Sequence, residues 1–384
     1  MSASVESRDL PNRRLAEDRG FLRRALELAR RGEALTSPNP MVGAVVVKDE
    51  WVVGEGFYTW DGLRHAEVLA LEQAGDAARG ATLYVNLEPC CHQGRTPPCA
   101  EAVIRAGITR VVTGMPDPNP LVSGGGLARL RAAGIEVQDG VLAEDCRELN
   151  AQFARYMAGG VFVTLKGAMT LDGCIAAPEQ KPDDRRITGQ EAQAYVQLLR
   201  HRHDALITGA GTVLADDPIL NDRSGLPRRR PLLRVVMDSG LRLPPGGRLA
   251  QSARGDLLVV CVHEASPARQ QALEARGVEV LRLSTSGRTP LDPVLAALHR
   301  REITSALLEA GSALNATVLE SGLVDKVVLF YAPKILGGQD ALPLFGGRGF
   351  RTLCQARPVR ITELRRIGDD FVVEGYLRET EPRP

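Results

Sequence analysis

Three side chains that commonly bind metals and one carboxylate stand at a spacing suited to hydrolytic chemistry. His65 is followed two positions later by Glu67, Pro89 precedes Cys90, and a further cysteine follows at Cys99. One imidazole and two thiolates fill three positions of a tetrahedral zinc site and leave the fourth position for water. Zinc lowers the pKa of such a water to about 7, so hydroxide becomes available at neutral pH.

Glu67 is the predicted proton carrier of this site. An amine leaves a heterocycle as ammonia only after its nitrogen gains a proton, and Glu67 is close enough to His65 in sequence to take a proton from water and pass it on. An H-x-E followed by P-C and a second cysteine is the signature of zinc deaminases of bases and nucleosides. We therefore expect His65, Cys90 and Cys99 to bind zinc and Glu67 to act as the catalytic group.

A structural zinc site is the alternative for the same residues. Such a site closes its shell with four protein ligands, and the spare candidates are Cys91 and His92. Both adjoin Cys90, which makes simultaneous tetrahedral binding awkward. The chain has seven cysteines, three of them crowded around this motif. This distribution indicates a metal site in a reducing compartment rather than a disulfide framework, so we expect a cytoplasmic protein.

The composition is that of an ordinary globular chain large enough for two domains. The 384 residues are 44% hydrophobic, and 48 Lys and Arg balance 47 Asp and Glu. No bulk positive charge therefore draws the chain to nucleic acid or to an anionic membrane. No stretch approaches the roughly 18 apolar residues of a transmembrane helix, and the amino terminus lacks the apolar core of a signal peptide. We expect two domains, with neither nucleic acid nor a membrane as partner.

Helical and strand patterns alternate along both halves of the chain, which predicts sheets covered by helices. In the first half the predicted helices span 21–31, 65–74, 100–106, 127–133 and 144–156. The predicted strands there span 41–47, 51–53, 82–87, 110–113 and 135–137, and the first two form a hairpin around Lys48-Asp49-Glu50.

A second alternation begins at residue 161. The predicted strands span 161–165, 205–208, 232–237, 257–262, 305–309, 326–331 and 371–376, and the predicted helices span 191–202, 268–275, 293–299 and 312–321. We place the boundary between Leu142 and Gly160, and interpret residues 1–17 as a disordered arm, 18–150 as the first domain and 151–384 as the second. The run Arg228-Arg229-Arg230 reads as a solvated loop.

The sequence around the two cysteines resembles one enzyme family. Residues 87–99 read LEPCCHQGRTPPC, and TSPNP, HAEV and DPNP blocks accompany this run at 36–40, 65–68 and 117–120. Further blocks follow in the second half: LK at 165–166, LDG at 171–173, ITG at 187–189, GTV at 211–213, ADDP at 215–218 and APK at 332–334. From about residue 19 to the end, these blocks closely resemble, in order, the bifunctional riboflavin-biosynthesis deaminase/reductase family.

The resemblance implies an α/β protein with two domains and two cofactors. The first would be a cytidine-deaminase-like three-layer α/β/α domain that uses Zn²⁺ to deaminate 2,5-diamino-6-(5-phosphoribosylamino)pyrimidin-4-one. The second would be a dihydrofolate-reductase-like α/β domain that reduces the ribosyl side chain of the product to ribityl with NADPH. Members of such fold families often pair through the reductase half, so the resemblance also implies a homo-oligomer, a dimer or a tetramer.

The resemblance also assigns residues to the second site. Those matching cofactor positions are Ala168, Thr212, Asp216, Ser239, Gly311, Ser312, Ala313, Leu314 and Asn315. Those matching substrate positions are Arg200, Leu220, Arg223 and Glu309. Gly311 and Ser312 follow a predicted strand and open a helix, where free backbone N–H groups favour a phosphate. Arg200 and Arg223 suit the substrate phosphate in forked geometry.

The sequence departs from the family at a few positions. Asp184 and Arg186 stand where the family has Ser and Trp, which removes a stacking surface and adds charge. Tyr58 stands where a His is common, and Cys91 where a Ser is common. In the family, the position of Asp184 touches the substrate and that of Arg186 touches the cofactor of the reductase site.

Two other functions remain open. One is a zinc deaminase of another base, nucleoside or nucleic acid with a degenerate reductase domain, and the other is a nucleotide- or metal-binding regulator without turnover. Against the first, the balanced charge and the long Cys90–Cys99 insertion with Arg95 suit a single phosphorylated metabolite better than a nucleic-acid strand. Against the second, a purely structural zinc site has no use for Glu67.

Overall fold

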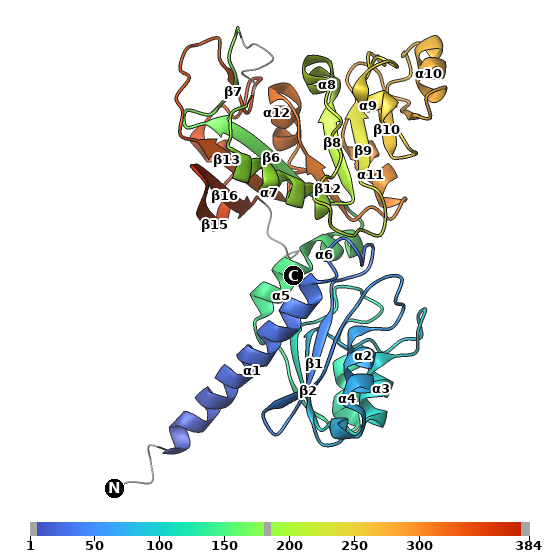
Figure 1. The fold of residues 1–384 in the computed structure, drawn as a ribbon, viewed down its shortest axis with the longest axis vertical. Helices are drawn as coiled ribbons and strands as arrows, with labels where there is room; N and C mark the ends of the chain where they lie inside the picture. Colours follow the sequence, from blue (N-terminus) through green and yellow to red (C-terminus); the bar gives the residue numbers. More distant parts are fainter. Residues whose placement is uncertain (1–5, 180–185, 378–384) are drawn as a thin grey trace. The chain divides into compact units, whose positions relative to one another are not determined.

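The computed structural model describes residues 6–179 and 186–377 and divides the chain into two compact units. The first unit ends at Ala158 and the second begins at Gly159 (Figure 1). The division lies within the expected interval but after the boundary drawn at 150, because helix α6 (Ala151–Met157) belongs to the first unit. Within the described ranges, none of the helices combines the length and apolar character needed to cross a membrane.

A five-stranded mixed sheet forms the centre of the first unit. Its strands, in the spatial order β2-β1-β3-β4-β5, are β2 (Trp51–Phe57), β1 (Gly43–Lys48), β3 (Thr82–Leu87), β4 (Arg110–Met115) and β5 (Glu136–Gln138). Strand β1 is antiparallel to β2 and β3, whereas β3, β4 and β5 are parallel. Asp49 and Glu50 take positive φ angles of 50° and 67° in the tight turn of the predicted hairpin, as a two-residue hairpin loop requires.

Helices cover both faces of this sheet, so the first unit has the expected three layers. One face carries α1 (Glu6–Arg30) and α5 (Ala143–Leu149). The other carries α2 (Ala66–Ala74), the short 3-10 helix η1 (Gly75–Ala78), α3 (Cys99–Arg105) and α4 (Gly125–Ala132). The central strands are buried on both faces, which explains why β1 reads as an unbroken Ala/Val run.

The amino-terminal segment differs from the prediction. Residues 6–17 form the first turns of α1, so the expectation of a disordered arm is wrong for them. The helix is anchored where Asp18, only 3% exposed, accepts hydrogen bonds from Arg110 at 2.7 and 2.8 Å and from the Tyr84 hydroxyl at 3.1 Å. Apolar periodicity could not predict the earlier turns, because they carry mainly charged side chains.

A nine-stranded mixed sheet forms the centre of the second unit. The spatial order is β11-β10-β9-β8-β12-β6-β13-β16-β15. The strands are β6 (Phe162–Thr170), β8 (Ala205–Gly209), β9 (Leu233–Met237), β10 (Leu257–Cys261), β11 (Glu279–Arg282), β12 (Ser305–Leu308), β13 (Lys326–Ala332), β15 (Arg360–Ile367) and β16 (Asp370–Tyr376). The order is parallel from β11 to β13 and antiparallel from β13 through β16 to β15. A separate pair joins β7 (Cys174–Ala176) to β14 (Leu342–Pro343).

The helices of the second unit cover this sheet. They are α7 (Gln190–His201), α8 (Ala210–Asp216), α9 (Arg248–Gln251), α10 (Pro267–Glu274), α11 (Asp292–His299), α12 (Ser312–Glu320) and the short η3 (Leu353–Gln355). Strands β8 to β11 follow one another outward, and β12 then returns between β8 and β6. The carboxyl ends of β8 and β12 therefore lie side by side, which is where α/β sheets bind ligands.

Two candidate sites, one in each unit

The zinc-type side chains of the first unit converge at the ends of two helices and one strand. His65 is the N-cap residue of α2, Cys99 is the first residue of α3, and Cys90 follows β3. Their ligand atoms all lie within 4.8 Å of one another. His65 Nδ1 is 3.0 Å from Cys99 Sγ and 3.6 Å from Cys90 Sγ.

The chemistry of this donor set fits a zinc ion. An imidazole and two sulfurs are the ligands that zinc prefers, and three of them leave one position open. Cys99 is fully buried at the amino end of α3, and its hydrogen bond with Cys90 together with burial raises the pKa of its thiol. Hydrogen bonds with Cys99 and His65 lower the pKa of the Cys90 thiol to about 4. The Oγ1 atom of Thr96 lies 3.2 Å from His65 Nε2 and orients the ring.

Glu67, two residues after His65, is a buried carboxylate beside these donors. It is 3% exposed, and burial raises its pKa to about 7. Its Oε2 atom has no hydrogen-bond partner among the described residues. A carboxyl group with a pKa near neutrality and an unused oxygen can both accept and release a proton, which is what general acid–base catalysis requires.

A cavity of about 260 Å³ opens beside His65 and Glu67. Its lining includes Asn39, Tyr58, Glu88, Arg95, Asp117, Asn119, Phe153 and Met157. Arg95 stacks over the Trp60 ring at 4.1 Å, and Tyr58 accepts a 2.7 Å hydrogen bond from the Asn39 amide while its ring meets His65 edge-on. Burial raises the pKa of Asp117 to about 6. The cavity is thus a mixed polar and apolar space of the size that holds a small molecule.

Glu88 organises one wall of this cavity, although the sequence marked it only as part of a motif. Its carboxylate, 2% exposed, accepts hydrogen bonds from the backbone N–H groups of Asp117, Gly124, Gly126 and Leu127 at 2.9 to 3.3 Å. A carboxylate at this place also complements the amino end of α4. No sequence signal identifies these partners, because all four lie beyond the next strand.

Helix α2 owes its position to two glycines of the neighbouring strand. A Cβ atom added at Gly54 would collide with the Ala70 carbonyl oxygen, and one added at Gly56 would collide with the Ala66 carbonyl oxygen and meet Leu69 Cβ at 2.7 Å. The helix backbone therefore rests directly on β2. Because Glu67 lies in the first turn of α2, this contact sets where the carboxylate stands.

In the second unit, Arg200 and Glu309 form a buried pair at the carboxyl ends of α7 and β12. Arg200 Nε and Nη2 donate to the two Glu309 carboxylate oxygens at 2.7 and 3.0 Å, and Lys166 Nζ lies 4.0 Å from Glu309 Oε2. Burial lowers the pKa of Lys166, whereas the pKa of Glu309 is held below its usual value by Arg200 against the effect of burial. The fork of Arg200 is thus occupied by Glu309, so the forked phosphate contact predicted for Arg200 is not available here.

The other substrate-type residues lie next to this pair. Leu220 is buried with a φ of 59°, and the Asn221 carbonyl oxygen accepts from Arg200 Nη1 at 3.0 Å. Arg223 is exposed, and its Nη1 donates to Asn221 Oδ1 at 3.0 Å. Arg200, Leu220, Arg223 and Glu309 therefore form one neighbourhood. Lys166 joins them although the sequence singled it out only as part of a block.

Some of the residues that match cofactor positions of the family lie close together. Gly311 is the N-cap of α12, and a Cβ at Gly311 would lie 3.5 Å from Thr212 Oγ1, while Leu314 contacts the Gly209 position at 3.5 Å. This places α8 and the start of α12, with Ser312 and Ala313, side by side. The fully buried Asn315 donates to the Ala310 and Leu344 carbonyl oxygens at 3.0 and 3.3 Å, so its amide supports the loop.

The remaining cofactor-type residues have other neighbours. Ser239 follows β9 and contacts Thr289, whose N–H donates to Ser239 Oγ at 2.9 Å. Ala168 packs with α7 against the core, and Asp216 ends α8. Of the two departures from the family in the reductase half, Asp184 lies outside the described residues. Arg186 is exposed, and its carbonyl oxygen accepts from Lys334 Nζ at 3.3 Å.

Comparison with known proteins matches both units to families. The profile of the cytidine and deoxycytidylate deaminase zinc-binding region matches residues 15–115, and that of the RibD C-terminal domain matches residues 161–373. Riboflavin biosynthesis protein RibD of Actinobacillus pleuropneumoniae is 41% identical over 359 residues, which cover 93% of this chain and 94% of the relative. The Synechocystis protein of the same name is 43% identical over 364 residues, covering 94% and 97%.

The chain belongs to the bifunctional riboflavin-biosynthesis deaminase/reductase family.

Solved structures of this family have the same fold over both units. Acinetobacter baumannii RibD, form 1, is 39% identical with a TM-score of 0.82. The Thermotoga maritima diaminohydroxyphosphoribosylaminopyrimidine deaminase/5-amino-6-(5-phosphoribosylamino)uracil reductase is 35% identical with a TM-score of 0.80. Each comparison covers 94% of this chain and 99% of the other. As a deaminase/reductase of this family, the protein has a deaminase and a reductase activity, with zinc for the first and NADPH for the second.

Proposed function

We propose that the first unit, including residues 18–150, deaminates 2,5-diamino-6-(5-phosphoribosylamino)pyrimidin-4-one. His65, Cys90 and Cys99 would bind zinc, and Glu67 would be the catalytic residue. The observation that carries this assignment is the convergence of one imidazole and two sulfurs within 4.8 Å beside a buried carboxyl group whose pKa is about 7. The open cavity next to them has room for a pyrimidine.

The residues of the chain supply the proton transfers of this reaction. Bound zinc supplies hydroxide at neutral pH by lowering the pKa of water. Glu67 takes the proton that water loses at its Oε2 atom and gives it to the departing amine nitrogen, so ammonia leaves without a net change in the carboxyl group. Arg95, held over Trp60 in the cavity lining, supports binding of the substrate phosphate.

For the second unit, we propose reduction of the ribosyl side chain of the deaminated product to ribityl. NADPH would supply a hydride to C1′ of the ribosyl group, which is an imine carbon once the sugar ring opens, and a proton on the imine nitrogen would complete the ribitylamine. The proposed cofactor-binding residues are Ala168, Thr212, Asp216, Ser239, Gly311, Ser312, Ala313, Leu314 and Asn315. The proposed substrate-binding residues are Arg200, Leu220, Arg223 and Glu309, joined by Lys166, which lies beside Glu309. Arg223 is the exposed guanidinium of this group and the one suited to the phosphate.

One assay tests both halves of the proposal. The diaminopyrimidine ribotide is supplied with NADPH to zinc-loaded protein, and ammonia release and NADPH oxidation are followed together. We expect both signals, with ammonia first. Ammonia without NADPH oxidation would favour the second candidate, a zinc deaminase with a degenerate reductase, for which the Arg186 and Asp184 departures are the motivation. The absence of both signals would overturn the enzymatic assignment. A regulator without turnover would then be the remaining function.

We also infer a homo-oligomer, either a dimer or a tetramer, in the cytoplasm. Leu364 and Phe371 are 69% and 42% exposed on edge strand β15 and its neighbour β16, and the strand register places them on one face of the sheet. Exposed apolar residues grouped this way are typical of an interface. All seven cysteines are free, which suits a reducing compartment. Light scattering of the purified protein tests the oligomer, and a strictly monomeric mass would overturn it.

A further inference from the structure

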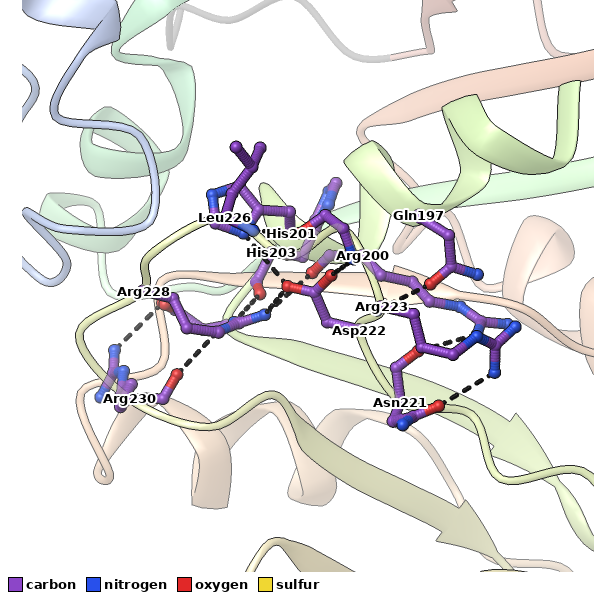
Figure 2. A network of polar contacts seen from close by, with 12 residues as sticks. Gln197, Arg200, His201, His203, Asn221, Asp222, Arg223, Leu226, Arg228 and Arg230 are labelled. Carbon is purple, nitrogen blue, oxygen red and sulfur yellow. Dashed lines mark hydrogen bonds and ion pairs between the residues drawn. The ribbon is translucent and has the colours of Figure 1, made fainter. Parts of the chain in front are cut away.

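A loop of the second unit is tied down by charged groups that the proposed reaction does not use. Residues 221–230, named the strap below, connect Leu220 to the approach of β9 and lie against the carboxyl end of α7 (Figure 2). The middle of the strap, from Gly225 to Pro227, is exposed, whereas its two ends are partly buried. The run Arg228-Arg229-Arg230 is a loop, as expected, but its residues are partly buried rather than fully solvated.

Arg228 makes the main hydrogen bonds that hold the strap in place. Its side chain is 15% exposed, and its guanidinium donates to Asp222 Oδ2 at 2.9 Å, to the His203 carbonyl oxygen at 2.9 Å and to the Arg230 carbonyl oxygen at 2.7 Å. A longer contact of 3.4 Å reaches the Arg200 carbonyl oxygen. One guanidinium thus joins both ends of the strap to the last turn of α7. Only an arginine offers enough donors in one plane for this.

Asp222, at the other end of the strap, accepts the hydrogen bonds that complete this network. Its Oδ2 atom faces both Arg228 and His201 Nδ1, the latter at 3.1 Å, and its Oδ1 accepts from the Ser224 N–H at 2.9 Å. Burial alone would raise the pKa of Asp222, but the hydrogen bonds from Ser224, His201 and Arg228 hold it below its usual value. The carboxylate therefore stays charged and paired.

Arg223 stands next to this network, and its own contacts lead to the substrate neighbourhood. Its backbone N–H donates to Gln197 Oε1 of α7 at 2.9 Å, and its guanidinium donates to Asn221 Oδ1. The Asn221 carbonyl oxygen in turn accepts from Arg200, which is paired with Glu309. Figure 2 shows Arg223 between Asn221 and Gln197, next to Arg200. The strap thus fixes the position of one exposed guanidinium relative to the buried pair of Arg200 and Glu309.

We propose that Asp222 and Arg228 are positioning residues that hold Arg223 where it binds the phosphate monoester of the reductase substrate. The inference rests on the proposed reductase function of this unit. Neither residue contacts the substrate; their pairing settles the conformation of the strap before binding. Without the pairing of Asp222 and Arg228, substrate binding has to order the strap. The entropic cost of that ordering weakens substrate affinity and does not slow the chemical step.

The test compares Arg228→Gln with the wild type in steady-state NADPH oxidation. We expect KM for the phosphorylated substrate to rise by about tenfold, which corresponds to about 1.4 kcal/mol of binding. We expect kcat and KM for NADPH to change by less than about twofold, and the Ki of inorganic phosphate as competitor to rise with KM. Asp222→Asn should act in the same direction, because it removes the charge that pairs with Arg228. Arg301→Gln, which breaks an arginine fork to Glu279 elsewhere in the unit, is the matched control and should leave KM unchanged.

A double-mutant cycle separates positioning from general structural damage. If Arg228 acts through Arg223, the Arg223→Gln/Arg228→Gln protein has the same raised KM as Arg223→Gln alone, whereas independent effects multiply. Multiplying effects, or a fall in kcat at unchanged KM, would overturn the proposal. NADPH oxidation by the wild type checks the reductase function separately. An unchanged kcat and KM for NADPH in each variant verify that the second unit is folded, and ammonia release verifies that the first unit is folded and loaded with zinc.

Discussion

The two candidate sites are built in different ways. In the first unit, the three zinc-binding side chains and the proton carrier come from the stretch between His65 and Cys99, and they meet because two helices begin close to where one strand ends. In the second unit, Lys166, Arg200 and Glu309 come from three separate elements and are held together by buried ion pairs. The first site therefore depends on a local motif, and the second on charge pairing across the sheet. Substitutions that act on one and spare the other test this contrast.

The largest effect is expected from removing a donor of the first site. Cys99→Ala leaves two protein ligands, too few for a zinc site of this class, so both bound zinc and deamination should be lost. NADPH oxidation with pre-deaminated substrate should stay within about twofold, since ion pairs rather than the metal build that site. Metal analysis and the two assays measure this. Cys354→Ala, at an exposed cysteine, is the control. Retained zinc in Cys99→Ala would contradict the ligand assignment.

Glu67→Gln separates proton transfer from metal binding. The amide keeps the size of the side chain but cannot carry a proton, so deamination should fall by about 10²- to 10⁴-fold. Zinc content should be unchanged, because Glu67 is not a donor. Glu72→Gln provides the comparison, as this residue of the same helix forms an ion pair with Arg64 on the surface. Full turnover in the Glu67 variant would mean that another group is the proton carrier.

Glu309→Gln tests the dependence of the second site on charge pairing. The change leaves Arg200 and Lys166 buried without their counter-charge, and breaking a buried pair costs about 3–5 kcal/mol. We expect NADPH oxidation to fall by about a hundredfold or more, with ammonia release unaffected. The surface counterpart Glu279→Gln should cost less than about 1 kcal/mol. If Glu309→Gln reduces nothing beyond what Glu279→Gln does, the contrast between the sites is wrong.

A smaller effect is expected from acid on the second unit. Burial lowers the pKa of His203 to about 4, whereas an unfolded chain binds that proton near pH 6.5. The free energy of unfolding should therefore be undiminished above about pH 6.5 and decline by about 3 kcal/mol as the pH falls toward 4. Urea unfolding of the second unit at several pH values measures the slope. In His203→Gln the slope should be shallower, and an identical slope would exclude His203 as its origin.

Most elements could be predicted from the sequence wherever an apolar pattern marks them. The predicted strand 82–87 coincides with β3, and the helix predicted at 191–202 differs from α7 by one residue at each end. Strand β15 was not predicted, because its side chains are charged or exposed and, among the described strands, it pairs with β16 alone. The first turns of α1 and the short strands β7 and β11 likewise lack an apolar period.

The sites follow the same rule. His65, Glu67, Cys90 and Cys99 could be found because the chemistry fixes residue types at short spacings. Glu88 and Lys166 could not, since their partners come from segments far away in the sequence. Asp222 and Arg228 could not either, because no sequence pattern predicts that the loop between them packs against the end of α7. The residues of the second site were predicted through a resemblance to a family. Only the structure shows that the guanidinium of Arg200 is paired with Glu309, whereas that of Arg223 is exposed.

Strand β2 has glycines where it contacts α2, and this has a consequence for inherited variation. At Gly54 and Gly56 there is no room for a single methyl group, since the carbonyl oxygens of Ala70 and Ala66 occupy that space. A genetic screen for loss of ammonia production should therefore recover alanine or serine at these two positions. Such alleles would alter no catalytic or zinc-binding side chain. They would nevertheless displace helix α2, which carries Glu67.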